Sequence, residues 1–169
     1  MTGLTTQPKK SLKLLSGRSH PLLADAVAKE LGVDVTPTSA YDFANGEIFV
    51  RFEESVRGTD AFVLQAHTTP INQWIMEQLI MVDALKRASA TRITVVVPFY
   101  GYARQDKKHR GREPISARLM ADLFKTAGAD RMIASGQPPS TSVQRSATRT
   151  RPASGETTVT GSPSSFVLT

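Results

Sequence analysis

Residues 94–118, TVVVPFYGYARQDKKHRGREPISAR, contain the clearest structural pattern in the chain. Three valines begin it as a buried strand, Pro98 ends that strand, and a turn rich in aromatic residues follows. A basic loop comes next, and Pro114 and Ser116 are typical of a helix start. In α/β proteins ligands bind at the carboxyl ends of strands, and helix N-termini and arginine forks favour phosphate oxygens. This order of elements therefore predicts a polyphosphate site.

The charge of this loop also has a simpler interpretation. Its cations surround a single carboxylate, Asp106, and they are Arg104, Lys107, Lys108, His109, Arg110 and Arg112. A run of lysine and arginine is often only a solvated surface. The position of the run, between a strand and a helix, is what favours a binding site.

Hydrophobic periodicity assigns the rest of the chain to alternating strands and helices. We expect strands at 11–16, 60–65 and 92–98, one more beginning at 130–133, and helices at 21–31, 70–88 and 116–127. Asn45-Gly46, followed by alternation over 48–52, indicates a hairpin. The alternation predicts the α/β class with a mainly parallel sheet flanked by helices.

Apolar spacing also predicts which helix faces are buried. The inward residues are expected to be Leu22, Leu23, Ala26, Val27 and Leu31 in the first helix, and Leu119, Leu123 and Phe124 in the last. Ser19 or His20 is expected to cap the first helix, with Pro21 at its first position.

Composition divides the chain into three parts. Residues 1–10 are predicted to be a flexible arm, 11–133 a folded domain, and 134–169 a disordered tail in which Ser and Thr supply 15 of 36 residues. The chain contains no run of about 18 apolar residues, so no membrane helix is predicted. The absence of cysteine fits a cytoplasmic protein, and the net charge of +6 predicts anionic partners.

Four segments resemble the N-terminal half of ribose-phosphate pyrophosphokinases. They are GRSHP at 17–21, FANGEIFVRFEESVRG at 43–58, MEQLIMVDALKRASA at 76–90 and FYGYARQDKKHRGREPISARL at 99–119. The resemblance covers roughly residues 14–133. It implies a phosphoribosyltransferase-like half-domain and a diphosphokinase of nucleotide biosynthesis. Such an enzyme transfers the diphosphoryl group of ATP to ribose 5-phosphate, giving phosphoribosyl pyrophosphate and AMP.

The resemblance also implies where ATP binds. The residues that match its two ATP motifs are Arg104, Gln105 and Asp106 in the basic loop, and Phe43, Asn45, Gly46 and Glu47 in the hairpin. Arg104 would contact phosphate or adenine, Phe43 would stack on the base, and Asn45 and Glu47 would contact its edge. In the family the hairpin reaches the site of a neighbouring subunit. A homo-oligomer built from dimers, up to a hexamer, is therefore implied.

Three further residues match positions that bind regulatory phosphate or ADP in the family: Ser55, Arg57 and Arg110. From the residues alone, these positions are also explained as ordinary polar side chains exposed to solvent.

Other parts of the family pattern have no match. In the family, three functional parts would follow residue 133: a Mg²⁺-binding histidine, a mobile catalytic loop and a loop that binds ribose 5-phosphate. The composition of this chain changes at the same point, which a shifted reading frame or a rearranged gene would explain. We therefore assign no catalytic residue and no metal ligand, although the family implies Mg²⁺, and expect this chain alone to be inactive. A non-catalytic nucleotide-binding subunit or gene remnant is the alternative. A nucleic-acid-binding module is less favoured, because no aromatic platform accompanies the cations.

Overall fold

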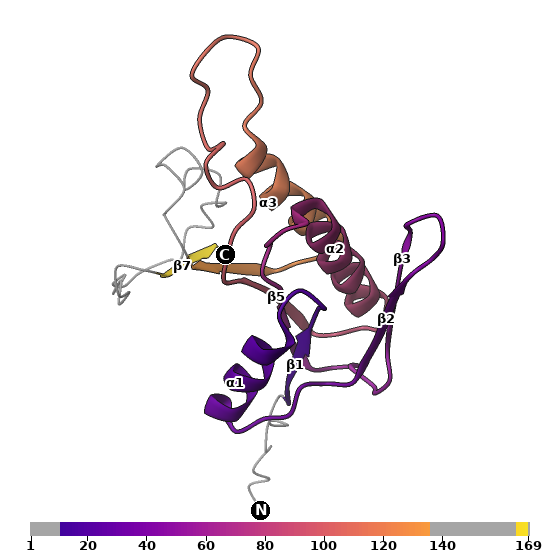
Figure 1. Cartoon of the computed structure of the whole chain (residues 1–169). Coiled ribbons are helices and arrows are strands. Elements are labelled where there is room, and N and C mark those ends of the chain that lie inside the picture. The colour runs from indigo at the N-terminus through magenta and orange to yellow at the C-terminus, as the bar shows by residue number, and fades with distance from the viewer. Residues whose placement is uncertain (1–10, 136–164, 169) are drawn as a thin grey trace, which may run out of the picture.

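The computed structural model describes residues 11–135 and 165–168. The predicted arm and most of the predicted tail lie outside these residues. The elements in order are β1 Leu12–Ser16, α1 Pro21–Leu31, β2 Thr38–Asp42, β3 Ile48–Phe52, β4 Asp60–Leu64, α2 Ile71–Arg87, β5 Arg92–Val97, α3 Ser116–Ala127, β6 Arg131–Ser135 and β7 Ser165–Leu168 (Figure 1).

The central sheet has the order β1-β4-β5-β6-β7, and its first four strands are parallel. Leu15 and Val63 face the core formed with α2 and α3, whereas their neighbours Leu14 and Leu64 pack with Ala24 of α1. Side chains alternate across a strand, so a sheet covered on both faces must be apolar on both. This confirms the predicted α/β class with a mainly parallel sheet flanked by helices.

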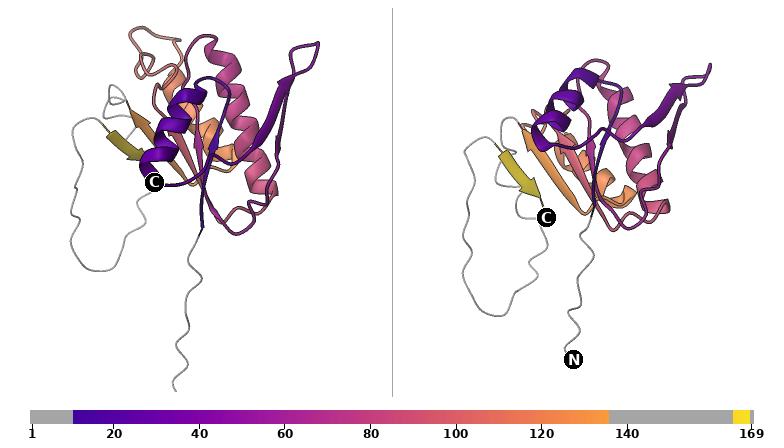
Figure 2. Two further views of the ribbon diagram at one scale, coloured as in Figure 1. Left: turned by 60° about the horizontal axis from the view of Figure 1, so that its bottom comes forward. Right: turned by 90° about the horizontal axis from the view of Figure 1, so that it is seen from below.

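The second sheet is the antiparallel hairpin of β2 and β3, in register from Thr38 opposite Phe52 to Asp42 opposite Ile48. Val50 and Phe52 pack against the main core at the base of the hairpin. Figures 1 and 2 show that its tip projects away from the central sheet.

Two segments differ from the expectation for the tail. β6 continues to Ser135, and β7 pairs with it antiparallel, from Met132 opposite Leu168 to Ser135 opposite Ser165. The outer edge of β6 offers backbone donors and acceptors, and residues 166–168, Phe-Val-Leu, favour a strand.

The buried faces of two helices were predicted only in part: Leu23 and Val27 of α1 pack against the core and Phe124 of α3 is buried as expected, but other predicted residues are exposed. In α1 the buried residues are Ala24 and Ala28, while Leu22 is 77% exposed and Leu31 is also exposed. In α3 they are Ser116, Ala117 and Phe124, while Leu119 and Leu123 are exposed. Small residues face the sheet because they let the helix approach closely, so the stripe is displaced from the bulkiest side chains. The cap was predicted correctly, since Nδ1 of His20 accepts from the Leu23 N–H at 3.1 Å.

Candidate functional site

The basic loop begins at the carboxyl end of β5 and is fixed to the core at its base. The His67 N–H donates to the Phe99 carbonyl at 2.9 Å, and the Gly101 N–H donates to Nδ1 of His67 at 3.1 Å. The Tyr100 hydroxyl donates to the carbonyl of Ala117, the second residue of α3, at 2.6 Å. Hydrogen bonds therefore hold both ends of the loop, one at the end of the sheet and the other at the start of α3.

Gln105 is the second fixed point of this loop. Its side-chain oxygen accepts from the Ser116 hydroxyl at 2.7 Å, and its carbonyl accepts from the Ala117 N–H at 3.1 Å. Both partners lie in the first turn of α3, whose N-terminal donors have no partner within the helix. Of the predicted ATP-contact residues, Arg104 and Gln105 are exposed and Asp106 is partly buried. Gln105 thus has a structural role that the sequence did not predict.

The tip of the loop is closed by Glu113. Its carboxylate accepts from the backbone N–H groups of His109 at 2.8 Å and Arg110 at 3.0 Å. The bonds from Arg110 and then His109 hold the pKa of Glu113 below its usual value. The basic residues Arg104, Lys107, Lys108, His109, Arg110 and Arg112 are all exposed. The loop therefore presents positive charge to solvent, which suits a polyphosphate.

The hairpin tip is a tight turn with an exposed aromatic ring. The Phe43 N–H donates to the Glu47 carbonyl at 2.7 Å, and the Glu47 N–H donates to Oδ1 of Asn45 at 3.1 Å. Gly46 has φ of +89°, a conformation that glycine adopts without strain. The Tyr41 ring stacks on Phe49 at 4.8 Å and meets the edge of Phe43 at 5.4 Å. Phe43 is nevertheless 46% exposed, so its ring contacts Tyr41 and is still accessible from solvent.

The two predicted ATP motifs do not meet within one chain. The hairpin tip and the basic loop lie on opposite sides of α2 in Figure 1 and in the left view of Figure 2. One chain therefore offers two separated halves of the predicted site.

The predicted regulatory residues are also divided. Ser55 and Arg57 are exposed in the loop before the amino end of β4, and Arg110 is exposed in the loop after the carboxyl end of β5. β4 and β5 are parallel, so these loops lie at opposite edges of the sheet.

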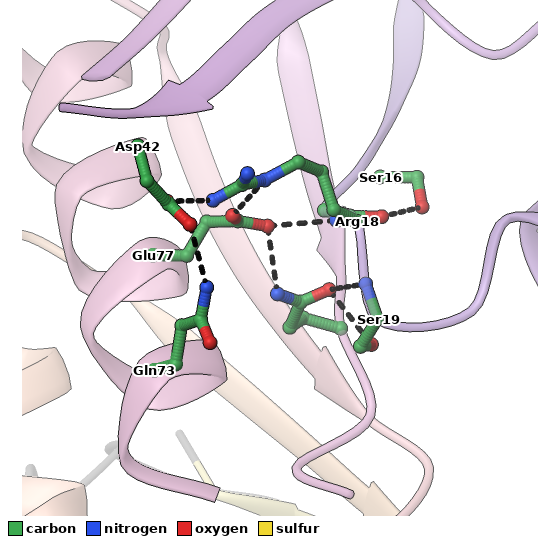
Figure 3. Close-up of polar contacts among 8 residues, drawn as sticks. Ser16, Arg18, Ser19, Asp42, Gln73 and Glu77 are labelled. Carbon is green, nitrogen blue, oxygen red and sulfur yellow. Dashed lines mark hydrogen bonds and ion pairs between the residues drawn. The ribbon is translucent and has the colours of Figure 1, made fainter. Parts of the chain in front are cut away.

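A buried polar network that the sequence analysis missed lies at the carboxyl edge of the sheet (Figure 3). Its centre is Glu77 of α2, which is 0% exposed. Oε1 of Glu77 accepts from the Arg18 N–H at 2.7 Å and from Nε2 of Gln65 at 2.9 Å, and Oε2 accepts from Nε of Arg18 at 2.5 Å. The Ser19 hydroxyl donates to the oxygen of Gln65 at 2.9 Å. A Cβ at Gly17 would lie 2.3 Å from that same oxygen, so any larger residue there would require the Gln65 side chain to move.

Two further buried residues, Gln78 and His67, connect this edge to the basic loop. Nε2 of Gln78 donates to the Val63 carbonyl at 2.9 Å, which leaves its oxygen to accept from Nε2 of His67 at 2.8 Å. Burial lowers the pKa of His67 to about 4, against the opposing effect of the bond to Gln78. The burial of Gln78 could have been predicted from the sequence, because Gln78 occupies a position of the apolar stripe between Ile75 and Val82. The sequence carried no comparable indication for His67.

The described residues offer no group of three or more His, Asp or Glu side chains that could hold a metal ion. No helix in the described part of the chain has the length and hydropathy needed to span a membrane.

A mainly parallel sheet with helices on both faces defines an α/β domain, a class in which ligands bind at the carboxyl ends of the strands. The profile of the N-terminal domain of ribose phosphate pyrophosphokinase matches residues 12–128. The chain belongs to the ribose-phosphate pyrophosphokinase family, as the sequence resemblance indicated.

Individual relatives agree with this assignment. The ribose-phosphate pyrophosphokinase of Streptomyces coelicolor is 70% identical over 134 residues, covering 79% of this chain and 41% of the relative. That of Corynebacterium glutamicum is 71% identical over 133 residues, covering 79% and 41%. The crystal structure of phosphoribosylpyrophosphate synthetase from Mycobacterium smegmatis matches with a TM-score of 0.73 and 74% identity, over 74% of this chain and 42% of that one. The chain thus spans about two fifths of the length of these relatives.

Proposed function

We propose that the chain binds ATP between its own basic loop and the hairpin of a second copy. In this way it supplies the nucleotide-binding half of a ribose-phosphate diphosphokinase. The observation that carries the proposal is the arrangement of exposed cations on a loop fixed at the carboxyl edge of the sheet. Family membership supports the same ligand.

The loop suits the triphosphate. Arg104 is exposed two residues after Tyr102, whose hydroxyl is bonded to Asn72 of α2 at 2.6 Å. The guanidinium can donate two parallel bonds to phosphate oxygens, which Lys cannot do. Because Gln105 is engaged through its oxygen, we assign the nucleotide contact to its Nε2 group. Asp106 is the third residue of the proposed ATP-contact motif in this loop.

The hairpin suits the base. The exposed Phe43 ring offers a face for stacking, and the exposed Glu47 carboxylate accepts hydrogen bonds from an exocyclic amine. Oδ1 of Asn45 is used inside the turn, so its NH₂ group is the part left for the base. One chain keeps the hairpin and its own loop on opposite sides of α2, so a complete site needs at least two copies. We therefore propose a homo-oligomer built from dimers.

A similar argument applies to regulation. Ser55 and Arg57 lie at one edge of the sheet and Arg110 at the other. We propose that these residues bind regulatory phosphate or ADP only where different copies bring the two edges together.

The complete reaction needs more than the described residues. Transfer of the diphosphoryl group of ATP to ribose 5-phosphate requires a positioned acceptor and stabilised phosphate charge. We expect purified chains of these 169 residues to release no AMP from ATP and ribose 5-phosphate. The measurement is an AMP-release assay with Mg²⁺ present. AMP release that depends on ribose 5-phosphate would contradict this expectation, and its absence together with ATP binding would favour the non-catalytic subunit.

The ATP site itself is tested by single substitutions. Arg104→Ala and Glu47→Ala are each expected to weaken ATP binding about 10-fold or more, because each removes a charge-assisted hydrogen bond. Equilibrium dialysis of the assembled protein measures the affinity. Arg87→Ala and Glu30→Ala, which remove exposed charges elsewhere, are the matched controls and should leave affinity unchanged. Unchanged affinity in both site variants would contradict the proposed site.

A further inference from the structure

Asp42, the last residue of β2, connects the hairpin to the body of the domain (Figure 3). Its Oδ1 accepts from Nη2 of Arg18 at 2.5 Å, and its Oδ2 accepts from Nε2 of Gln73 at 2.9 Å. Arg18 lies in the turn between β1 and α1, and Gln73 lies in the first turns of α2. Both oxygens of one carboxylate are therefore held by two different elements, directly before Phe43.

Arg18 is itself firmly anchored. Its Nε bonds to the fully buried Glu77 at 2.5 Å, and its guanidinium lies over the Trp74 ring, 5.9 Å from the ring centroid. Partial burial alone would lower the pKa of Arg18, but the bonds to Asp42 and Glu77 outweigh it and raise the pKa. The Arg18 side chain is 31% exposed and that of Asp42 is 37% exposed. Arg18 thus joins a buried carboxylate to a carboxylate on the hairpin.

The hairpin depends on such a connection. Two-stranded sheets are marginally stable by themselves and rely on packing against the rest of a fold. β3 supplies apolar packing at the base through Val50 and Phe52. β2 is joined to the turn between β1 and α1, and to α2, through the polar contacts of Asp42. The apolar contacts thus lie on β3, while the polar contacts lie on β2 at the residue directly before Phe43.

We infer that Arg18 and Asp42 are positioning residues that set the direction of the hairpin tip. In doing so they determine how well Phe43 and Glu47 meet a nucleotide held by another copy. The effect on the nucleotide rests on the proposed function, whereas the effect on the hairpin does not. Neither residue contacts the nucleotide in this arrangement, so both act through the segment that follows Asp42.

The test uses Asp42→Ala in the 169-residue chain, because this change releases the hairpin without leaving the buried Glu77 unpaired. We expect backbone amides in the β2–β3 ladder and the turn to exchange hydrogen about 10-fold faster, with β4 and β5 unchanged. ATP affinity should fall several-fold. Asp42→Asn keeps an acceptor oxygen and should restore part of both effects.

The matched control is Asp83→Ala. Asp83 is also a partly exposed carboxylate bonded to an arginine, Arg87, at 2.6 Å, but it lies at the other end of α2. The Asp83→Ala variant should change neither the hydrogen exchange rate of the hairpin amides nor the affinity for ATP. Unaltered hairpin exchange in Asp42→Ala would overturn the inference, even if the wild-type chain binds ATP. Faster exchange in a chain that binds no ATP would leave the positioning role standing and would contradict the proposed function.

Discussion

Replacing Glu77 with glutamine is expected to lower the free energy of unfolding by about 3 kcal/mol, the low end of the cost of breaking a buried ion pair. Every hydrogen bond of the Glu77 carboxylate is accepted from an N–H group, two from Arg18 and one from Gln65. The NH₂ group of glutamine would face one of these donors whichever way it turned. The low end applies because Arg18 is partly exposed and can be solvated when its partner is lost.

Urea denaturation measures this effect. Glu54→Gln is the matched control, since Glu54 also pairs with a cation, Lys13, but its side chain is 47% exposed. Exposed pairs contribute little, so this control should stay within about 0.5 kcal/mol of the wild type. Equal midpoints for Glu77→Gln and Glu54→Gln would show that the buried network does not hold the fold together.

The second large effect is a loss of stability in acid that depends on His67. The neutral ring accepts from the Gly101 N–H and donates to Gln78, so it has to stay uncharged in the folded protein. Its pKa is lowered from 6.5 to about 4 on folding. Between these values the unfolded chain binds more protons, so the free energy of unfolding falls as the pH falls through this window. The contribution of His67 to this fall is about 3 kcal/mol between pH 7 and pH 4.

His67→Asn isolates this contribution, because asparagine can accept the Gly101 bond and does not titrate in this range. The variant should be less stable at pH 7, yet lose about 3 kcal/mol less than the wild type on going to pH 4. His20→Asn, at an exposed cap where asparagine serves as well, should leave the stability at pH 7 close to that of the wild type. The same pH dependence in His67→Asn and the wild type would contradict a buried neutral His67.

The order of strands and helices as far as β6 was predictable from local sequence signals, whereas β7 lies in the segment predicted to be disordered. Runs such as Val95-Val96-Val97 and breaks at Pro98 and Gly32 fix the element boundaries within a residue or two. The buried faces of α1 and α3 were not predictable from apolar spacing alone. Ala24 and Ala28 are buried and Leu22 is exposed because the approach of the helix to the sheet decides the face.

The candidate site divides in the same way. Exposed residues such as Arg104 and Phe43 lie in continuous segments with distinctive sequences, so the resemblance could nominate them as candidates. Glu77 and Arg18 were missed because their partners come from separate segments, and each alone looks like an ordinary surface residue. Gln65 carried a weak signal, a polar side chain at the end of an apolar strand run.

The proposed sharing of one site between two copies is tested most directly by co-expressing the Arg104→Ala and Glu47→Ala chains. Each variant alone should bind ATP weakly, because every site lacks one of its halves. In a mixed pair, one site combines the intact loop of one chain with the intact hairpin of the other. Random pairing should therefore restore wild-type affinity at about a quarter of the sites, as counted by equilibrium dialysis. A mixture that binds no more ATP than either variant alone would contradict a site built from two copies.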